Sequence, residues 1–336
     1  GTTLRFLLGR LSRLEGEFTI EVSARLSERP HEELFNFLSA LGLSIHQQGN
    51  KYHLHSLGWG MDRDLATVNC SQSSQFASAI LLNAFALPKP FSFRVQGLRS
   101  SLSYWEMTKN ICRSANLRFT EQDGRVDVQA QCLVDSVPDC EPDLSSAFSL
   151  AAIAAIGNNP VCLRNLPKNS MQADVIFIKL LQQMGVEMHC LDHPLNSAKM
   201  DLRINPSRPF LKAIRFDFTD APDLFPVTAA LCSLARGTSI LSGLHSLKFK
   251  ESDRLEQSLK LIRMAGRSAI LCGDEVSIHG STEAAEDFIY DPDQDHRMAM
   301  AAAVLKASGQ GIRILDPEVV DKSFPGFWDA SGVIPQ

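Results

Sequence analysis

The chain has 336 residues, of which 44% are hydrophobic, so it is long enough for two domains with sizeable cores. Its 33 Lys and Arg against 38 Asp and Glu give a net charge of -5, which argues against a general binder of nucleic acids or membrane surfaces. Eight singly scattered cysteines favour reduced thiols. We expect a cytoplasmic protein with neither nucleic acid nor membrane as partner, and leave a plastid location open.

The first 56 residues alternate between helical and extended patterns. They predict a helix at Thr3–Leu14, a strand at Phe18–Val22, a helix at His31–Leu41 and a hairpin that turns near Gly49-Asn50. This order of helix, strand, helix and hairpin is the first copy of a pattern that recurs along the chain.

Two histidines, His53 and His55, share one face of the second strand of that hairpin. A transition metal needs at least one further ligand, and none is apparent in the pattern. The sequence therefore favours an ordinary hairpin surface over a metal site.

Four later stretches consist mainly of small apolar residues and predict buried helices: Ser74–Leu87, Ser145–Ile156, Pro226–Ala235 and His296–Ala307. Each leads into a short strand: Phe91–Val95, Val161–Arg164, Thr238–Leu241 and Gly311–Leu315. More polar, amphipathic helices follow the first three strands: Tyr104–Ser114, Ala173–Met184 and Glu251–Met264. Hairpins then turn at Asp123-Gly124 and Gly273-Asp274.

The repeat predicts an α/β (α+β) fold of two domains with buried helices inside and sheets outside. We expect the boundary near Cys132–Asp143, where prolines interrupt the pattern, giving domains 1–140 and 141–336. The repeat begins without a first strand and its fifth copy stops early. We therefore expect the chain to lack an N-terminal segment.

Two polar clusters lie at predicted helix starts. The run Ser71–Gln75 offers hydroxyls and free backbone N–H groups to a phosphate, although an ordinary N-cap explains it equally simply. Lys250, Glu251 and Arg254 open an amphipathic helix and place a carboxylate between cations; a solvated first turn is the alternative. Taken singly, both clusters favour the ordinary interpretation.

Asp295 is placed to cap the apolar helix that follows it, and the neighbouring Arg297 opposes the helix dipole. Arg297 should therefore have an anionic partner, for which Asp295 and Asp293 are candidates. Asp223 has no evident capping role, which makes it a candidate general base. Charged groups at several helix starts together indicate a cleft that closes on a multiply charged substrate.

Several motifs closely resemble those of 5-enolpyruvylshikimate-3-phosphate (EPSP) synthases, an enolpyruvyl transferase family. They recur in family order along the whole chain, among them Gly1-Thr2-Thr3-Leu4-Arg5, Glu28-Arg29-Pro30, Ser73-Ser74-Gln75-Phe76, Lys250-Glu251-Ser252-Asp253-Arg254 and Asp295-His296-Arg297-Met298. The resemblance implies a two-domain fold, each domain an inside-out α/β barrel of βαβαββ units. It also implies transfer of the enolpyruvyl group of phosphoenolpyruvate to the 5-hydroxyl of shikimate 3-phosphate, by a monomer without metal or redox cofactor.

The resemblance also implies roles for individual residues. Asp223 would accept the hydroxyl proton and Glu251 would protonate the methylene carbon. The shikimate 3-phosphate site would comprise Ser73, Ser74, Gln75, Ser101, Tyr104, Ser246 and Lys250. Phosphoenolpyruvate would lie among Gly1, Arg29, Gln75, Arg254, Arg297 and Lys322, because arginine forks suit its carboxylate and phosphate.

Some features depart from the family. Its Lys, Ser and Arg of the first strand and loop, and the Asn before Gly1, have no counterpart here, and position 246 is Ser instead of a larger polar residue. We therefore weigh a truncated, non-catalytic homologue as an alternative. The related transferase of UDP-N-acetylglucosamine is a weaker one, because Ser23–Glu28 contains neither the Cys nor the Gly of that family's loop. An RNA-terminal phosphate cyclase is weaker still.

Overall fold

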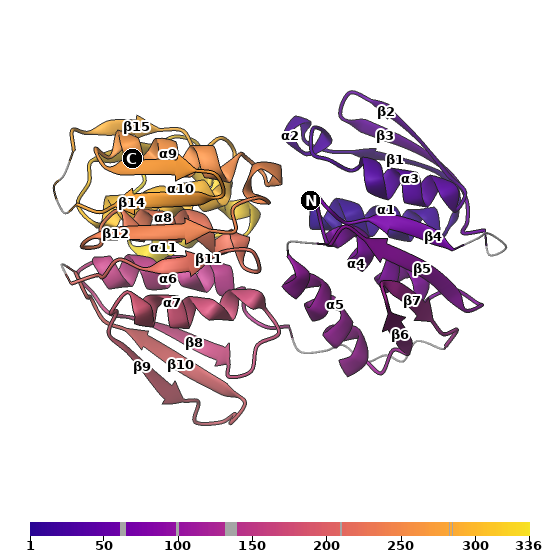
Figure 1. Ribbon diagram of the computed structural model, residues 1–336, viewed down its shortest axis with the longest axis horizontal. Coiled ribbons are helices and arrows are strands. Elements are labelled where there is room, and N and C mark those ends of the chain that lie inside the picture. Colours follow the sequence, from indigo (N-terminus) through magenta and orange to yellow (C-terminus); the bar gives the residue numbers. More distant parts are fainter. Residues whose placement is uncertain (61–64, 99–100, 132–139, 209, 282, 284) are drawn as a thin grey trace. The chain divides into compact units, whose positions relative to one another are not determined.

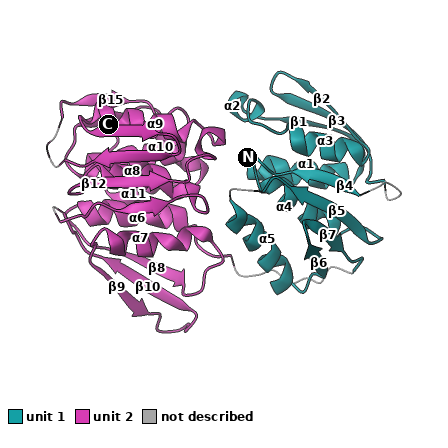
Figure 2. Ribbon diagram, in the orientation of Figure 1, with its two compact units in different colours: residues 1–139 teal, residues 140–336 magenta. Residues whose placement is uncertain are grey.

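The computed structural model describes the chain apart from residues 61–64, 99–100, 132–139, 209, 282 and 284. The chain forms two compact units, Gly1–Asp139 and Cys140–Gln336 (Figure 2). The boundary expected at Cys132–Asp143 falls mostly on residues 132–139 and to that extent lies outside the described residues. Among the described helices, none is long and apolar enough to cross a membrane.

Both units alternate short helices and strands (Figure 1). The first contains α1 (Thr2–Ser12), β1 (Glu15–Glu21), α2 (Ala24–Ser27), α3 (Glu32–Ala40), β2 (Leu43–Gln48), β3 (Lys51–Leu57), β4 (Ala66–Asn69), α4 (Gln75–Ala84), β5 (Phe91–Gln96), α5 (Leu102–Ser114), β6 (Phe119–Gln122) and β7 (Arg125–Val128).

The second unit adds four short 3-10 helices to the same pattern. It contains α6 (Leu144–Ile156), β8 (Val161–Pro167), η1 (Ala173–Ile176), α7 (Phe177–Gln183), β9 (Met188–Asp192), β10 (Lys199–Ile204), β11 (Arg215–Asp217), η2 (Pro222–Leu224), α8 (Phe225–Cys232), β12 (Thr238–Ser242), η3 (Leu247–Phe249), α9 (Arg254–Met264), β13 (Ser268–Cys272), β14 (Glu275–His279), β15 (Phe288–Tyr290), α10 (His296–Ala307), β16 (Ile312–Ile314), η4 (Pro317–Lys322) and α11 (Phe327–Ser331).

The sheets repeat one topology. Their orders are β4-β5-β7-β6 and β11-β12-β14-β13, each with a parallel first pair followed by antiparallel pairs. The sheets β1-β3-β2 and β8-β10-β9 follow the same order without the leading strand, and β15 pairs with β16 in parallel. These are the βαβαββ units that the family resemblance implies. The leading strands β4 and β11 have four and three residues, too short for the alternating pattern to reveal.

The four helices of small apolar residues form the interior, as predicted. Every residue of α8 and all but one of α6 are buried. In the second unit α10 packs against both α6 and α8, and in the first unit α4 packs against α1 (Figure 1). A helix that is apolar all round must bury its whole circumference, which places the sheets on the outside.

Aspartate caps explain where three helices begin. Asp295 accepts a hydrogen bond from the backbone N–H of Arg297 and caps α10, as the sequence predicts. Asp143 does the same for α6. The prediction that a helix begins at Glu251 is wrong: α9 begins at Arg254, because the side chain of Asp253 accepts from the N–H of Glu256 and ends the preceding turn.

Candidate active site

In the first unit, one buried guanidinium organises a group of polar residues. From α1, Nη1 of Arg5 donates to Oγ of Ser73 at 3.1 Å and to Oε1 of Gln75 at 2.7 Å, at the start of α4. Its Nη2 donates to the carbonyl of Pro30 at 3.1 Å, and the guanidinium lies 5.0 Å from the ring centre of Phe76. All these partners are neutral, so the positive charge remains available to an anionic ligand.

His31 holds this arginine from the other side. Its Nε2 lies 3.0 Å from the carbonyl of Leu26 and therefore carries the proton, which leaves Nδ1 to accept from Nε of Arg5 at 3.4 Å. Burial and the charge of Arg5 lower the pKa of His31 to about 4. Burial and neighbouring Arg29 lower the pKa of Arg5 to about 9. At neutral pH the pair is thus a neutral imidazole and a cation.

The structure brings five predicted residues of this unit to or near helix starts. Ser73 also accepts the N–H of Gln75 at 3.3 Å, whereas Ser74, the residue at the cap position of α4, makes no side-chain cap. Ser101 precedes α5 in a left-handed conformation, φ 60°, again without a side-chain cap, and Tyr104 lies in the first turn of that helix. The hydroxyls of Ser74 and Ser101 are thus not spent on capping, which weakens the ordinary interpretation of the serine run.

Gly1 and Arg29 lie against each other. A Cβ built on Gly1 would be only 2.5 Å from Nη1 of Arg29, so the guanidinium occupies the space that a side chain would fill. The absence of a side chain at this position is therefore what lets Arg29 approach the start of α1.

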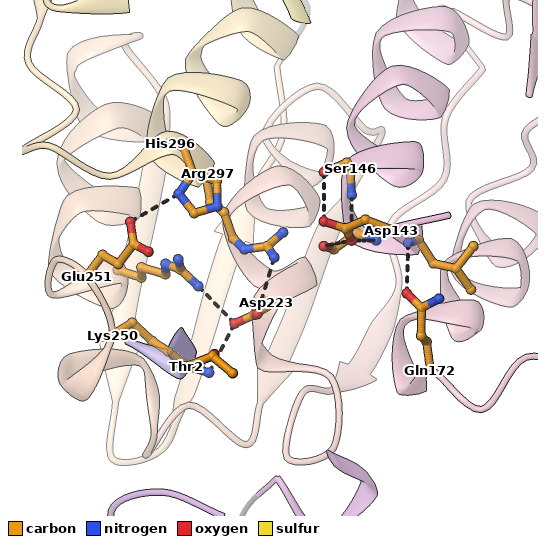
Figure 3. A network of polar contacts seen from close by, with 12 residues as sticks. Thr2, Asp143, Ser146, Gln172, Asp223, Lys250, Glu251, His296 and Arg297 are labelled. Carbon is orange, nitrogen blue, oxygen red and sulfur yellow. Dashed lines mark hydrogen bonds and ion pairs between the residues drawn. The ribbon is translucent and has the colours of Figure 1, made fainter. Parts of the chain in front are cut away.

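In the second unit, Asp223 is the centre of a dense charge cluster (Figure 3). Its Oδ1 lies 3.0 Å from Nζ of Lys250 and 2.9 Å from Nη1 of Arg254, and its Oδ2 lies 3.3 Å from Nη2 of Arg297. The three cations come from the segment before α9, the start of α9 and the start of α10. Arg297 has the anionic partner that the sequence predicts, but this partner is Asp223, whereas the candidate Asp295 is engaged by Arg254.

The cluster shifts the ionisation of its members. Burial opposes the charge of Asp223, but Lys250, Arg297 and Arg254 outweigh it and hold the pKa of Asp223 well below its usual range. Burial lowers the pKa of Lys250, and Asp223 only partly offsets that effect. Burial opposes the charge of Arg297, but Asp223, together with Asp174 and Asp143, outweighs it and raises the pKa of Arg297. Asp223 is therefore ionised and shared among three cations that an anionic substrate can also use.

Asp295 holds Arg254, one of the cations of the cluster, in place. This fully buried carboxylate accepts from Nε of Arg254 at 2.7 Å, from Nη2 at 3.2 Å, and from the N–H and hydroxyl of Ser252. Arg254 outweighs the effect of burial and lowers the pKa of Asp295 to about 2. The guanidinium of Arg254 is thereby fixed with one nitrogen, Nη1, left for Asp223.

Glu251 pairs with His296, whose Nδ1 lies 3.0 Å from Oε2 of the carboxylate (Figure 3). Burial opposes the carboxylate charge, but the hydrogen bond from His296 lowers the pKa of Glu251 below its usual value. Glu251, Asp295 and His296 bring ligand-type atoms within 4.8 Å of one another. Hydrogen bonds among these residues and to Arg254 account for this grouping, which we interpret as a proton-transfer network.

Two further predicted residues complete this unit. Nζ of Lys322, at the end of η4, donates to the carbonyl of Gln294 at 2.7 Å. Gln294 lies just before α10 and three residues before Arg297, so this bond brings Lys322 to the start of α10. Ser246 begins η3 and is buried, and its hydroxyl has no hydrogen-bond partner within the described structure. A buried hydroxyl without a partner is expected where a ligand supplies one.

Comparison with known proteins decides the family. Residues 1–330 match the sequence profile of EPSP synthase (3-phosphoshikimate 1-carboxyvinyltransferase). The chain belongs to the EPSP synthase family. Proteins named 3-phosphoshikimate 1-carboxyvinyltransferase from Methanoregula boonei and Pyrococcus abyssi are each 32% identical to it over 332 residues, covering 98% of this chain and 76% of theirs.

Solved structures agree on the fold. The EPSP synthase of Acinetobacter baumannii has a TM-score of 0.73 at 23% identity and covers 99% of this chain and 76% of its own. The enolpyruvyl transferase NikO of Streptomyces tendae has a TM-score of 0.68 at 14% identity, covering 98% and 75%. The predictions of an EPSP synthase-type transferase and of its fold are confirmed.

Sequence reasoning missed three residues of this EPSP synthase family member. Arg5 was part of a recognised motif but was given no role. A signal was present: Arg5 shares one face of α1 with Leu8 and Ser12, all three of which are buried. His31 and His296 were also missed, because their roles depend on contacts with Arg5 and Glu251 that lie 26 and 45 residues away in sequence.

Proposed function

We propose that the chain transfers the enolpyruvyl group of phosphoenolpyruvate to the 5-hydroxyl of shikimate 3-phosphate, giving EPSP and inorganic phosphate. The observation that carries this proposal is the charge cluster around Asp223. One carboxylate and three cations there come from separate segments, and each cation has a nitrogen within 3.3 Å of a carboxylate oxygen of Asp223. A second carboxylate, Glu251, precedes α9 and is paired with His296. Two acid–base groups beside a set of cations suit addition and elimination on a doubly anionic enol ester.

In the addition step Asp223 takes the proton of the 5-hydroxyl while that oxygen bonds to the central carbon of phosphoenolpyruvate. His296 first passes a proton to Glu251, and Glu251 gives it to the methylene carbon, which becomes a methyl group, so that Glu251 is again a carboxylate. In the elimination step Glu251 takes a methyl proton back, the carbon–carbon double bond reforms, and the carbon–oxygen bond to phosphate breaks. Asp223 returns its proton to the leaving phosphate. Protons and electron pairs balance over the two steps.

In this proposal the first unit supplies hydroxyls and two guanidinium groups, and the second supplies the acid–base carboxylates and further cations. We assign the phosphate of shikimate 3-phosphate to Ser73, Ser74 and Ser101, and its ring to Gln75, Tyr104, Ser246 and Lys250. Arg5 adds a guanidinium to this group through its bonds to Ser73 and Gln75. We assign phosphoenolpyruvate to Gly1, Arg29, Gln75, Arg254, Arg297 and Lys322, whose guanidinium and ammonium groups match a carboxylate and a phosphate.

Without ligand, Asp223 is a weak base, because the three cations hold its pKa well below its usual range. An efficient general base has a pKa closer to the working pH. Anionic substrate that takes over Arg254, Arg297 and Lys250 would relieve this effect and raise the pKa of Asp223. Substrate binding would thus make Asp223 a stronger base for the reaction that follows.

The test is to incubate the untagged chain with both substrates and to measure EPSP by NMR and phosphate by a coupled assay. We expect the two products in equal amounts. Glu251→Gln should reduce the rate by roughly 10²–10⁴-fold, whereas Glu256→Gln, an exposed residue two positions into α9, should leave it unchanged. Glu256 serves as the matched control for loss of a carboxylate near the same helix start.

Other outcomes would overturn the proposal. A folded chain that binds shikimate 3-phosphate without releasing phosphate would be a non-catalytic homologue. Enolpyruvyl transfer to UDP-N-acetylglucosamine, with none to shikimate 3-phosphate, would identify the rival acceptor. We further propose a cytoplasmic monomer that needs no cofactor, and sedimentation at micromolar concentration tests the oligomeric state.

A further inference from the structure

The outer face of the sheet β1-β3-β2 carries an unusual number of imidazoles. Along β3 exposed and buried residues alternate strictly, so His53 and His55 point outward while Tyr52 and Leu54 point into the unit. On the neighbouring strand β2, His46 is also exposed. The three histidines belong to two adjacent strands and one face of the sheet.

The strand register brings His46 and His53 directly opposite each other. Residues opposite in an antiparallel pair have Cβ atoms about 4.5–5.5 Å apart, and diagonal neighbours such as His46 and His55 about 7–8 Å. Imidazole nitrogens bind transition metals at about 2.0–2.1 Å, so two facing imidazoles span one ion. The structure thus supplies the third ligand that the sequence pattern of His53 and His55 did not reveal.

Neighbouring polar groups orient two of the rings. Across β1, the hydroxyl of Thr19 lies 3.2 Å from Nδ1 of His53, and Oε1 of Glu17 lies 3.7 Å from Nδ1 of His55. In both cases the engaged nitrogen is Nδ1, which leaves Nε2 for another partner. A histidine that binds a metal typically uses its other ring nitrogen for a hydroxyl, carbonyl or carboxylate in this manner.

These side chains line a shallow depression of about 360 Å³ together with Ser44, Phe18, Ile45 and Leu54. We propose that His46, His53 and His55 form a binding site for a divalent cation of the Ni²⁺, Cu²⁺ or Zn²⁺ type. Imidazole ligands suit these ions, whereas Mg²⁺ and Ca²⁺ require oxygen ligands. Water completes the coordination in this open position, and the ion joins β2 to β3.

The second unit contains a natural counterpart with a single histidine. There His279 of β14 lies opposite Thr238 on one side, with its Nδ1 3.1 Å from the threonine hydroxyl, and opposite Ser268 on the other. The surroundings of His53 are the same on the threonine side, but His46 takes the place of the serine. A variant of His279 therefore shows how much a single strand histidine, without a second one opposite it, contributes to metal binding.

The three imidazoles need to rotate to share an ion, because among the described residues only Glu251, Asp295 and His296 already have three ligand atoms within 4.8 Å. Exposed side chains change rotamer within picoseconds to nanoseconds, so this rearrangement is not a barrier to binding. The site is thus flexible and lies on the sheet face opposite Tyr52, which packs edge-on against His31.

The experiment is calorimetric titration of the untagged chain with Ni²⁺ at pH 7.5, with chelator-treated buffers. We expect one ion per chain for the unaltered protein. His46→Ser and His53→Gln should each weaken binding roughly tenfold or more. His279→Gln should bind Ni²⁺ as tightly as the unaltered chain.

Since His46 and His53 are exposed, their variants should fold, and circular dichroism checks this. The proposal fails if His46→Ser and His53→Gln bind Ni²⁺ like the unaltered chain, which would place the ion on cysteines or the Glu251 group. It also fails if only His53→Gln weakens binding, since a single histidine would then suffice. Both results are independent of enolpyruvyl transfer.

Discussion

The polar clusters of the two units surround their buried charges in opposite ways. In the first unit a single buried cation, Arg5, is surrounded by neutral acceptors such as Ser73 and Gln75. In the second unit the carboxylate of Asp223 gathers three cations around itself. Among the described residues, no carboxylate pairs with the cation of the first cluster, whereas Asp223 partly balances the three cations of the second.

This difference teaches how each cluster should respond to an anion. The first can bind phosphate without giving up an ion pair, because the acceptors that hold Arg5 are neutral. The second must exchange partners, so that substrate binding and the ionisation of Asp223 are linked. Under the proposed function, the first cluster would mainly position the substrate and the second would mainly carry out the acid–base chemistry.

Asp223→Asn should have the largest effect. Loss of the general base should reduce kcat by roughly 10²–10⁴-fold. The loss of negative charge among three cations should also lower the free energy of unfolding. The control is Asp253→Asn, which removes a charge at the cap of α9 while asparagine retains the cap. Steady-state kinetics and urea unfolding of both variants check this; a kcat that changes no more than in the control would exclude a base role.

Arg5→Met should have a smaller and different effect. The apolar stem still packs on Phe76, but the charge-assisted bonds, worth about 1.5–3 kcal/mol, are lost. We expect KM for shikimate 3-phosphate to rise roughly 10–100-fold, with a smaller change in kcat. Arg10→Met, an exposed arginine of the same helix, is the matched control. A dominant effect on kcat would move Arg5 from positioning to chemistry.

The last expected effect concerns stability in acid. The pKa of His31 is about 4 in the folded chain, below the 6.5 of free imidazole. The unfolded chain therefore binds the proton first, so the stabilisation is complete above pH 6.5 and is lost as the pH falls toward 4. The loss should approach about 3 kcal/mol. Urea unfolding between pH 7 and 4 should show a shallower decline for His31→Gln; parallel curves would contradict a neutral His31.

Sequence alone predicts the parts of the fold whose cause is local. The run from Met298 to Val304 is apolar all round, so its burial follows from composition. Asp123-Gly124 turns β6 into β7, because both residues have positive φ, which glycine and aspartate tolerate. Asp295 caps α10 through the adjacent turn, which is also a local interaction.

The pairings within the site are different. Asp223 and Arg254 are 31 residues apart, and Arg297 is farther still, so only the packing of α8, α9 and α10 brings them together. The sequence pattern suggests nearby aspartates as partners of Arg297, because it shows neighbours along the chain and not contacts in space. The motif resemblance supplied the residues of the site but not the ion pairs among them.

The five hydrogen bonds on the buried carboxylate of Asp295 have a mechanical consequence. They fasten Ser252 and Arg254, at the approach to α9, to the first turn of α10 through Arg297. The backbone segments that carry Glu251 and Arg297 must therefore move together as a rigid body in any rearrangement of this unit. Adjustment to a ligand is left to long side chains at the margin, above all Lys250 and Lys322.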